Sequence, residues 1–260
     1  MTLDSIMNDH DELRDNIAVT NLEYPTKKVD SLYAVVLVQS FLFCFNTYKA
    51  LGIILRERYY EQASVLVRIL WEATLNLAWV DEYPAQRAKL FCQFTVVEKR
   101  KFVLFKVSEA KRLRDTSALA AAEQNLRNFD AKYADVLDDY RFQDKKGKKK
   151  IRSRLSSPSI EEQARQLGGA WAKEYREVYP LLSLYAHATP GAILFPNSPD
   201  RLLSPERCVE EDIERTQMVA LWSMALIERA HRFLQPLCGV NDSDYFESLN
   251  ARINFRQSLA

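Results

Sequence analysis

Apolar positions recur along most of this chain every three or four residues, which is the spacing of one face of an α-helix. Prolines, glycines and short polar stretches separate these amphipathic segments. In the first part of the chain the pattern predicts helices over residues 3–19, 30–58, 60–81, 85–114 and 117–141. Asp30 is the expected N-cap of the second and most apolar of them.

The second part of the chain predicts further helices over residues 159–187, 205–234 and 243–255. Gly168-Gly169 should interrupt the first of these briefly. Residues 189–205 contain four prolines and a glycine, so we expect a loop there. Ser204-Pro205 then opens the next helix, with serine as the cap and proline in the first turn.

Composition agrees with a helical protein. The chain has only six glycines in 260 residues, and β-rich or glycine-cradled nucleotide folds need more of them at positive φ. We therefore expect an all-α fold, a single multi-helix bundle of about seven to nine helices. Residues 1–29 should form an N-terminal helix and turn, and residues 30–260 the bundle, with a mobile basic loop over residues 144–158.

The basic loop concentrates the charge of the chain. Asp144–Arg154 holds seven basic residues and one acidic residue, a local charge of +6, whereas the net charge of the whole chain is +1. Either a solvated loop or a contact with an anion explains this run. The candidate phosphate-binding residues are Lys148, Lys149, Lys150 and Arg152.

Cysteine usage and hydropathy indicate a cytoplasmic protein without a metal centre. The four cysteines are far apart in the chain and lack metal-ligand spacing, so we expect reduced thiols, no metal and no cofactor. The N-terminus is polar and acidic, unlike a signal peptide. Leu32–Tyr48 is uncharged over 17 residues, at the lower limit for a membrane span, but polar residues interrupt it. We expect a core helix and no membrane contact.

The third predicted helix carries a polar stripe on an otherwise apolar segment. Arg68, Glu72 and Asn76 follow one another at four-residue spacing, which places them on one face. A charge in an apolar helix must be paired or line a wet pocket. Arg68 and Glu72 can pair with each other for stability alone, or the stripe can face a polar cavity.

A second stripe lies on the helix before the proline-rich loop. The residues at four-residue spacing there are Tyr175, Tyr179, Ser183 and His187. Pro180 should kink this helix and leave the carbonyl of Arg176 without its usual partner. The two stripes can meet in one pocket, whose members would also include Asn76 and Arg176. His187 can equally be a structural residue.

The remaining histidines carry weaker signals. His10 lies in an acidic helix and His231 lies between two arginines, so we expect both to be solvated. Ser183 and His187 do not form a hydrolase signature, because no nucleophile elbow surrounds the serine.

The two stripes together also resemble the pattern of a known protein family. The pattern Ala63, Leu66, Arg68, Glu72, Ala73, followed by the tyrosine–serine–histidine stripe, resembles a bacterial all-helical family known only as a domain of unknown function. It covers roughly residues 30–190. More distantly the chain is similar to the HEPN superfamily, many of whose members are metal-independent RNases of toxin or phage-defence systems. Their arginine and histidine share one helix, whereas here Arg176 is the nearest upstream arginine to His187.

Two functions follow from these patterns and both stay open. The first is a binding or interaction module with a polar pocket between helices, whose exposed apolar faces either form a homodimer or dock another partner. The alternative is an HEPN-like RNase whose candidate catalytic residues are His187, Arg68 and Glu72. In that case His187 is the general acid or base, Arg68 or Arg176 stabilises the phosphorane, and RNA or another anionic partner contacts the basic loop.

Overall fold

The computed structural model describes residues 2–23, 31–143, 147, 149–151, 159–187, 205–238 and 243–258. Helices make up almost all of this part of the chain, which confirms the expected all-α class. The chain divides into two compact units, residues 1–82 with 160–260 and residues 83–159. The division expected from the sequence, after residue 29, falls at a different place.

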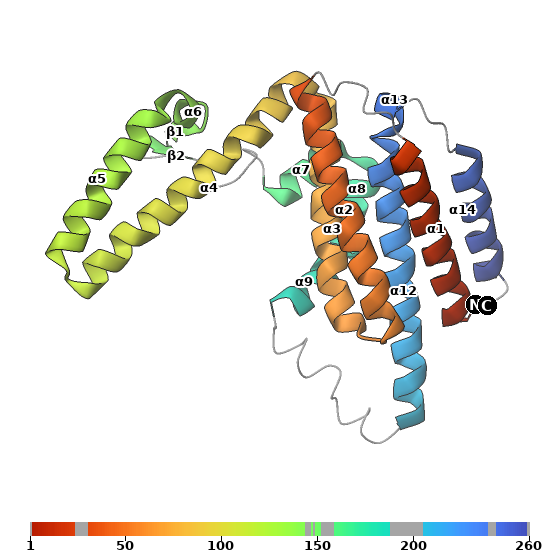
Figure 1. Cartoon of the computed structure of the whole chain (residues 1–260). Helices are drawn as coiled ribbons and strands as arrows, with labels where there is room; N and C mark the ends of the chain where they lie inside the picture. Colours follow the sequence, from red (N-terminus) through yellow and green to blue (C-terminus); the bar gives the residue numbers. More distant parts are fainter. Residues whose placement is uncertain are drawn as a thin grey trace. The chain divides into compact units, whose positions relative to one another are not determined.

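Unit 1 is a bundle of long helices with shorter helices on one side (Figure 1). Its elements are α1 (Leu3–Glu23), α2 (Leu32–Arg56), α3 (Tyr60–Glu82), α7 (Ile160–Leu167), α8 (Gly169–Glu177), α9 (Tyr179–Ala186), α12 (Pro205–Arg232), α13 (Gln235–Cys238) and α14 (Ser243–Ser258). Helices α2, α3 and α12 pack against one another, and α1 packs along α12. Large side chains such as Tyr48 and Trp71 fill the core between them.

The boundaries of these helices follow local sequence signals. The N-cap of α2 is Ser31 rather than the expected Asp30, because the Ser31 hydroxyl accepts a hydrogen bond from the Ala34 amide at 3.1 Å. Pro205 is the first residue of α12, as expected. The described residues do not include Asp30, Ser204 or residues 189–204 of the expected loop.

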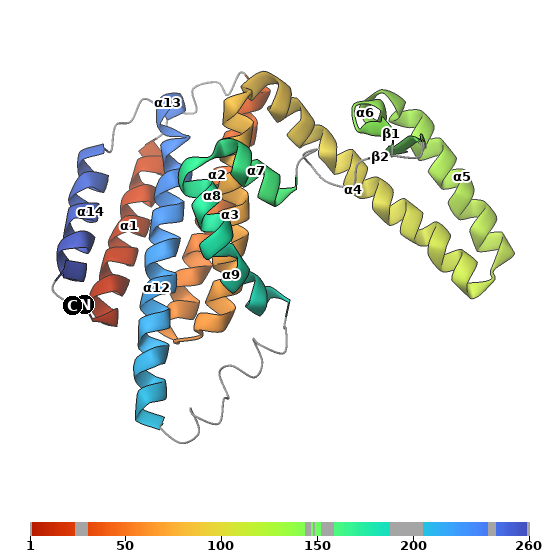
Figure 2. The same cartoon turned by 180° about the vertical axis from the view of Figure 1, so that it is seen from behind.

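The kink expected at Pro180 is a complete break between two helices. Helix α8 ends at Glu177 and α9 begins at Tyr179, with Pro180 in its first turn. Gly168 precedes α8 with a φ of 67°, which glycine adopts without strain. Figure 2 shows α8 and α9 lying along α3 beside α12.

Unit 2 is a helical hairpin with a small sheet. Its elements are α4 (Pro84–Leu113), α5 (Thr116–Lys132), α6 (Ala134–Asp138), β1 (Arg141–Gln143) and β2 (Lys149–Ile151). Arg100 of α4 holds Asp130 of α5 through two hydrogen bonds, at 2.7 and 2.8 Å. Val97, Leu137 and Tyr140 form a small buried cluster.

The small sheet corrects two expectations. The helix predicted over residues 117–141 breaks at Tyr133, and Arg141–Gln143 is a strand. That strand pairs antiparallel with Lys149–Ile151, inside the region expected to be a mobile loop. Gly147 between the strands has a φ of 73°, which suits a turn. The backbone groups of both strands therefore find partners that a loop would lack.

Two further observations concern burial. His10 and His231 are buried, so the expectation that they are solvated is wrong. Helices α2 and α3 are long and apolar enough to cross a membrane by length and composition. Many residues of both helices are buried inside unit 1, as in a core helix. The cytoplasmic location stays a prediction.

Candidate functional site

The two polar stripes meet where α3 and α9 pack against each other. Apolar neighbours hold α3 in place, since Val67, Leu70 and Trp71 are buried around Arg68. Leu182 is the buried anchor of α9. This packing directs the side chains of Arg68 and Glu72 toward Tyr179 and His187.

The four side chains form a continuous hydrogen-bonded group, which we call the Arg68 cluster. The Arg68 guanidinium donates from Nε to Glu72 Oε1 at 2.9 Å and from Nη2 to the Tyr179 hydroxyl at 3.0 Å. Its Nη1 lies 3.0 Å from His187 Nε2. The Tyr179 hydroxyl in turn donates to Glu72 Oε1 at 2.8 Å. Residues more than a hundred positions apart thus converge on one guanidinium.

These contacts shift the titration of two members. Burial raises the pKa of the Tyr179 phenol, and the hydrogen bond to the Glu72 carboxylate raises it further. Burial alone would lower the pKa of Arg68, but the hydrogen bonds to Tyr179 and Glu72 outweigh it and raise the pKa. Arg68 is therefore a fixed cation and Tyr179 a neutral donor.

His187 occupies the exposed edge of the cluster. It is the C-cap of α9, and its backbone amide donates to the Ser183 carbonyl at 3.2 Å. Because a guanidinium only donates, His187 Nε2 must act as the acceptor in the contact with Arg68.

Other residues of the two stripes do not join the hydrogen-bonded group. Tyr175 stacks on Tyr179, with ring centroids 5.1 Å apart. The Ser183 hydroxyl donates to the Tyr179 carbonyl at 2.8 Å and so stays within its own helix. Arg176 is exposed and Asn76 is half-buried, and neither hydrogen-bonds to the cluster among the described residues.

The candidate phosphate-binding residues belong to unit 2. Lys149 and Lys150 lie in β2, and the side chain of Lys150 is exposed. Lys148 and Arg152 lie outside the described residues. Among the residues that are described, no group of three or more His, Cys, Asp or Glu side chains is placed to hold a metal ion.

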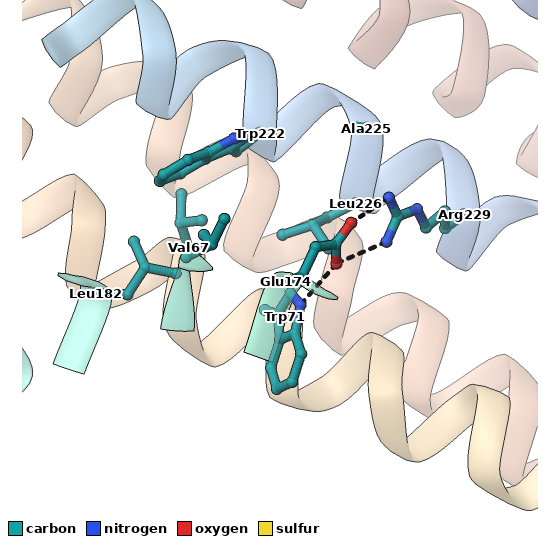
Figure 3. A pocket seen from close by; sticks show the side chains of 9 residues that line it. Val67, Trp71, Glu174, Leu182, Trp222, Ala225, Leu226 and Arg229 are labelled. Carbon is teal, nitrogen blue, oxygen red and sulfur yellow. Dashed lines mark hydrogen bonds and ion pairs between the residues drawn. The ribbon is translucent and has the colours of Figure 1, made fainter. Parts of the chain in front are cut away.

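A second polar group, which the sequence did not predict, anchors α8 (Figure 3). Glu174 accepts a hydrogen bond from Trp71 Nε1 at 2.9 Å and is held by both terminal nitrogens of Arg229, one at 2.8 Å. The Arg229 guanidinium also lies over the Trp171 ring, 5.2 Å from its centroid. Beside this group is a cavity of about 60 Å³ lined by apolar side chains such as Val67 and Leu226. Glu174 therefore ties α8 to both α3 and α12.

Comparison with known proteins places the chain in a group without an established activity. The sequence model of a family of unknown function, DUF5677, matches residues 34–199. This span contains all four members of the Arg68 cluster and confirms the expected resemblance to a domain of unknown function. No curated protein and no solved structure matches the chain.

Proposed function

This chain belongs to DUF5677, a family of unknown function, and we propose that the protein is a binding module for a phosphate-bearing RNA strand. The strand binds at the exposed side of the Arg68 cluster. The observation that carries this proposal is the 3.0 Å contact between the Arg68 guanidinium and the exposed His187 imidazole. A cation and an acid–base group are thus within reach of a single phosphate.

The guanidinium has donors to spare. Of its five N–H groups, one binds Glu72, one Tyr179 and one His187. In the described part of the chain, one N–H on each terminal nitrogen has no protein acceptor. Two N–H groups on one planar fork suit two oxygens of a phosphate.

The rest of the cluster supports the binding of an anion. Glu72 and Tyr179 fix the guanidinium before a ligand arrives, so little side-chain entropy is lost on binding. The spare N–H groups of Arg68 and the N–H of the exposed His187 imidazole then donate hydrogen bonds to the phosphate oxygens.

An open site favours a strand over a small molecule. His187 is exposed, and the cavity of about 60 Å³ beside Glu174 is lined by residues outside the Arg68 cluster. Tyr175, half-buried and stacked on Tyr179, offers an aromatic ring near the phosphate on which a base can stack.

A second candidate function is metal-independent cleavage of the same RNA, because His187 Nε2 is an acceptor in the structure. A phosphate oxygen that takes over the Arg68 N–H frees Nε2 to receive the proton of the 2′-hydroxyl. The 2′ oxygen bonds to phosphorus, the bond to the 5′ oxygen breaks, and the leaving oxygen takes a proton from water. Arg68 stabilises the charge of the phosphorane. The products are a 2′,3′-cyclic phosphate and a 5′-hydroxyl.

One experiment tests both functions. Labelled single-stranded RNA is titrated with wild-type protein and with His187→Ala, Arg68→Lys and Arg176→Ala, in buffer that contains EDTA. Fluorescence anisotropy measures the dissociation constant, and gels measure cleavage. Arg176→Ala is the matched control, since it removes an exposed cation of α8 outside the cluster.

We expect His187→Ala and Arg68→Lys each to weaken RNA binding about tenfold, the effect of one lost charge-assisted hydrogen bond. Arg176→Ala should change it less than twofold. Equal binding by wild type and His187→Ala would contradict the proposal. Intact RNA with the expected affinities supports binding alone, and cleavage that His187→Ala abolishes supports the second function.

A further inference from the structure

A second and larger cavity lies in unit 1, between α3, α9 and α12. Its volume is about 260 Å³. The walls are mostly apolar, and three of the side chains that form them are partly exposed: Leu181, Leu184 and Met218. Trp222 of α12 also lines the cavity. A concave, mostly apolar surface with a few polar groups is the usual lining of a small-molecule binding site.

The polar end of this cavity has balanced charges. Arg215 Nη1 donates to the Tyr60 hydroxyl at 3.0 Å, and its Nη2 lies 3.6 Å from the Glu211 carboxylate. A second carboxylate, Glu61, lies near Tyr60. Burial raises the pKa of Tyr60 to about 12 against the hydrogen bond from Arg215, and the charge of Glu61 adds to the rise. Among the described residues, the Arg215 guanidinium is therefore already matched by a carboxylate, and a ligand with a negative charge gains no uncompensated positive charge from it.

Ser64 supplies a hydrogen-bonding group on the wall of the cavity. Its buried hydroxyl donates to the Tyr60 carbonyl at 2.7 Å, one turn earlier in α3. A serine hydroxyl has one proton and two acceptor lone pairs. With the proton used within the helix, Ser64 can accept a hydrogen bond from a ligand.

The volume limits the size of that ligand. A molecule of liquid water occupies roughly 30 Å³, so the cavity has room for about nine atoms of the size of oxygen or a methylene group. Water itself would find few partners on these walls. An apolar molecule would bury its surface against the apolar lining, and the hydrophobic effect favours that burial.

We propose that this cavity binds an uncharged apolar molecule with a single hydroxyl group, of the size of a medium-chain alcohol. Its hydrocarbon part lies against Leu181, Leu184 and Met218, and its hydroxyl donates to Ser64. The cavity and the Arg68 cluster have no lining residue in common, so this proposal does not depend on RNA binding.

The test is calorimetric titration of the full chain with 1-octanol and, separately, with sodium octanoate at pH 7. The two probes have hydrocarbon chains of equal length and differ in charge. The variants are Met218→Trp and Leu184→Trp, which fill the cavity from partly exposed positions, and Ser64→Ala, which removes the acceptor. Leu104→Trp is the matched control, because Leu104 lies on α4 and is 38% exposed, against 40% for Met218. Circular dichroism checks the fold of each variant.

We expect saturable binding of 1-octanol at one site and at least tenfold weaker binding of octanoate. Ser64→Ala should weaken octanol binding several-fold. A tryptophan at 218 or 184 should abolish it, and Leu104→Trp should leave it unchanged. Octanoate binding as tight as octanol binding would overturn the assigned ligand class. Heats that do not saturate, or octanol binding that survives in both cavity-filling variants, would overturn the site itself.

Discussion

Replacing Glu174 with glutamine should destabilise unit 1, because this carboxylate joins three helices. Glutamine has nearly the same shape, and its amide oxygen can still accept the hydrogen bond from Trp71 Nε1. It cannot neutralise Arg229, whose two terminal nitrogens both bind Glu174. The substitution therefore removes the charge while keeping the packing.

The magnitude follows from how far the pair is buried. The side chains of Glu174 and Arg229 are 22% and 33% exposed. Exposed ion pairs contribute about 0.2–1 kcal/mol, and breaking a fully buried pair costs about 3–5 kcal/mol. For a partly buried pair held by two hydrogen bonds we expect a loss of about 2 kcal/mol. In a unit of this size that lowers the melting temperature by roughly 4–8 °C.

Thermal unfolding followed by circular dichroism or calorimetry measures this loss. Arg165→Gln is the matched control in the same unit, since Arg165 is 72% exposed and pairs with Glu162 on the surface of α7. That change should cost less than about 0.5 kcal/mol. A melting temperature for Glu174→Gln within about 1 °C of the wild type would refute the idea that Glu174 anchors α8.

Two further predictions concern the packing of α1 on α2. Burial lowers the pKa of His10 to about 3 and that of His231 to about 4, below the value near 6.5 of the unfolded chain. Only the unfolded state then takes up protons as the pH falls from about 6.5 to 4, so stability should fall over that window. His10→Phe should reduce the slope by up to ~1.4 kcal/mol per pH unit in pH-dependent urea titrations. Gly52→Ala should lower stability by about 1–3 kcal/mol in the same assay, although alanine favours helices, because its Cβ would lie 2.9 Å from His10 Cε1; an unchanged or raised stability would contradict this.

The two polar faces that form the Arg68 cluster were predictable because helical periodicity is local. Four-residue spacing puts Arg68 and Glu72 on one face, and twice that spacing puts Tyr179 and His187 on another. A cation in an apolar helix needs partners, but Glu72 alone can supply one, so the spacing left open whether the two faces meet. A kink at Pro180 followed from the same local chemistry, and the structure has a complete break between α8 and α9 there.

The partners of Glu174 were not predictable in this way. Glu174 belongs to neither polar stripe, and its partner Arg229 lies 55 positions further along the chain. No local spacing connects the two residues. The burial of His10 was not predicted for a related reason. The charged residues beside His10 in the sequence lie on other faces of α1. The histidine ring itself stacks on Tyr48, with ring centroids 3.9 Å apart.

The small sheet and the division into two units depend on contacts between elements. The lysine-rich composition around Gly147 suggests a solvated loop, and only the pairing of β1 with β2 gives its backbone an alternative. Likewise α4 and α5 have the same amphipathic pattern as the helices of unit 1. Only the packing of each helix shows to which unit it belongs.

The exposure of His187 allows the functional role of the Arg68 cluster to be separated from its structural role. Helix α9 has eight residues and is too short to be stable alone, so contacts with neighbouring helices hold it in place. Leu182 supplies an apolar contact, and the hydrogen bond from Arg68 to Tyr179 supplies a polar one. Changing Arg68 therefore alters both the position of α9 and any ligand contact.

His187 follows the last turn of α9 and is exposed, so its removal changes the chemistry of the site and leaves those two anchors intact. Lost RNA binding in His187→Ala at an unchanged melting temperature would have to come from the imidazole itself.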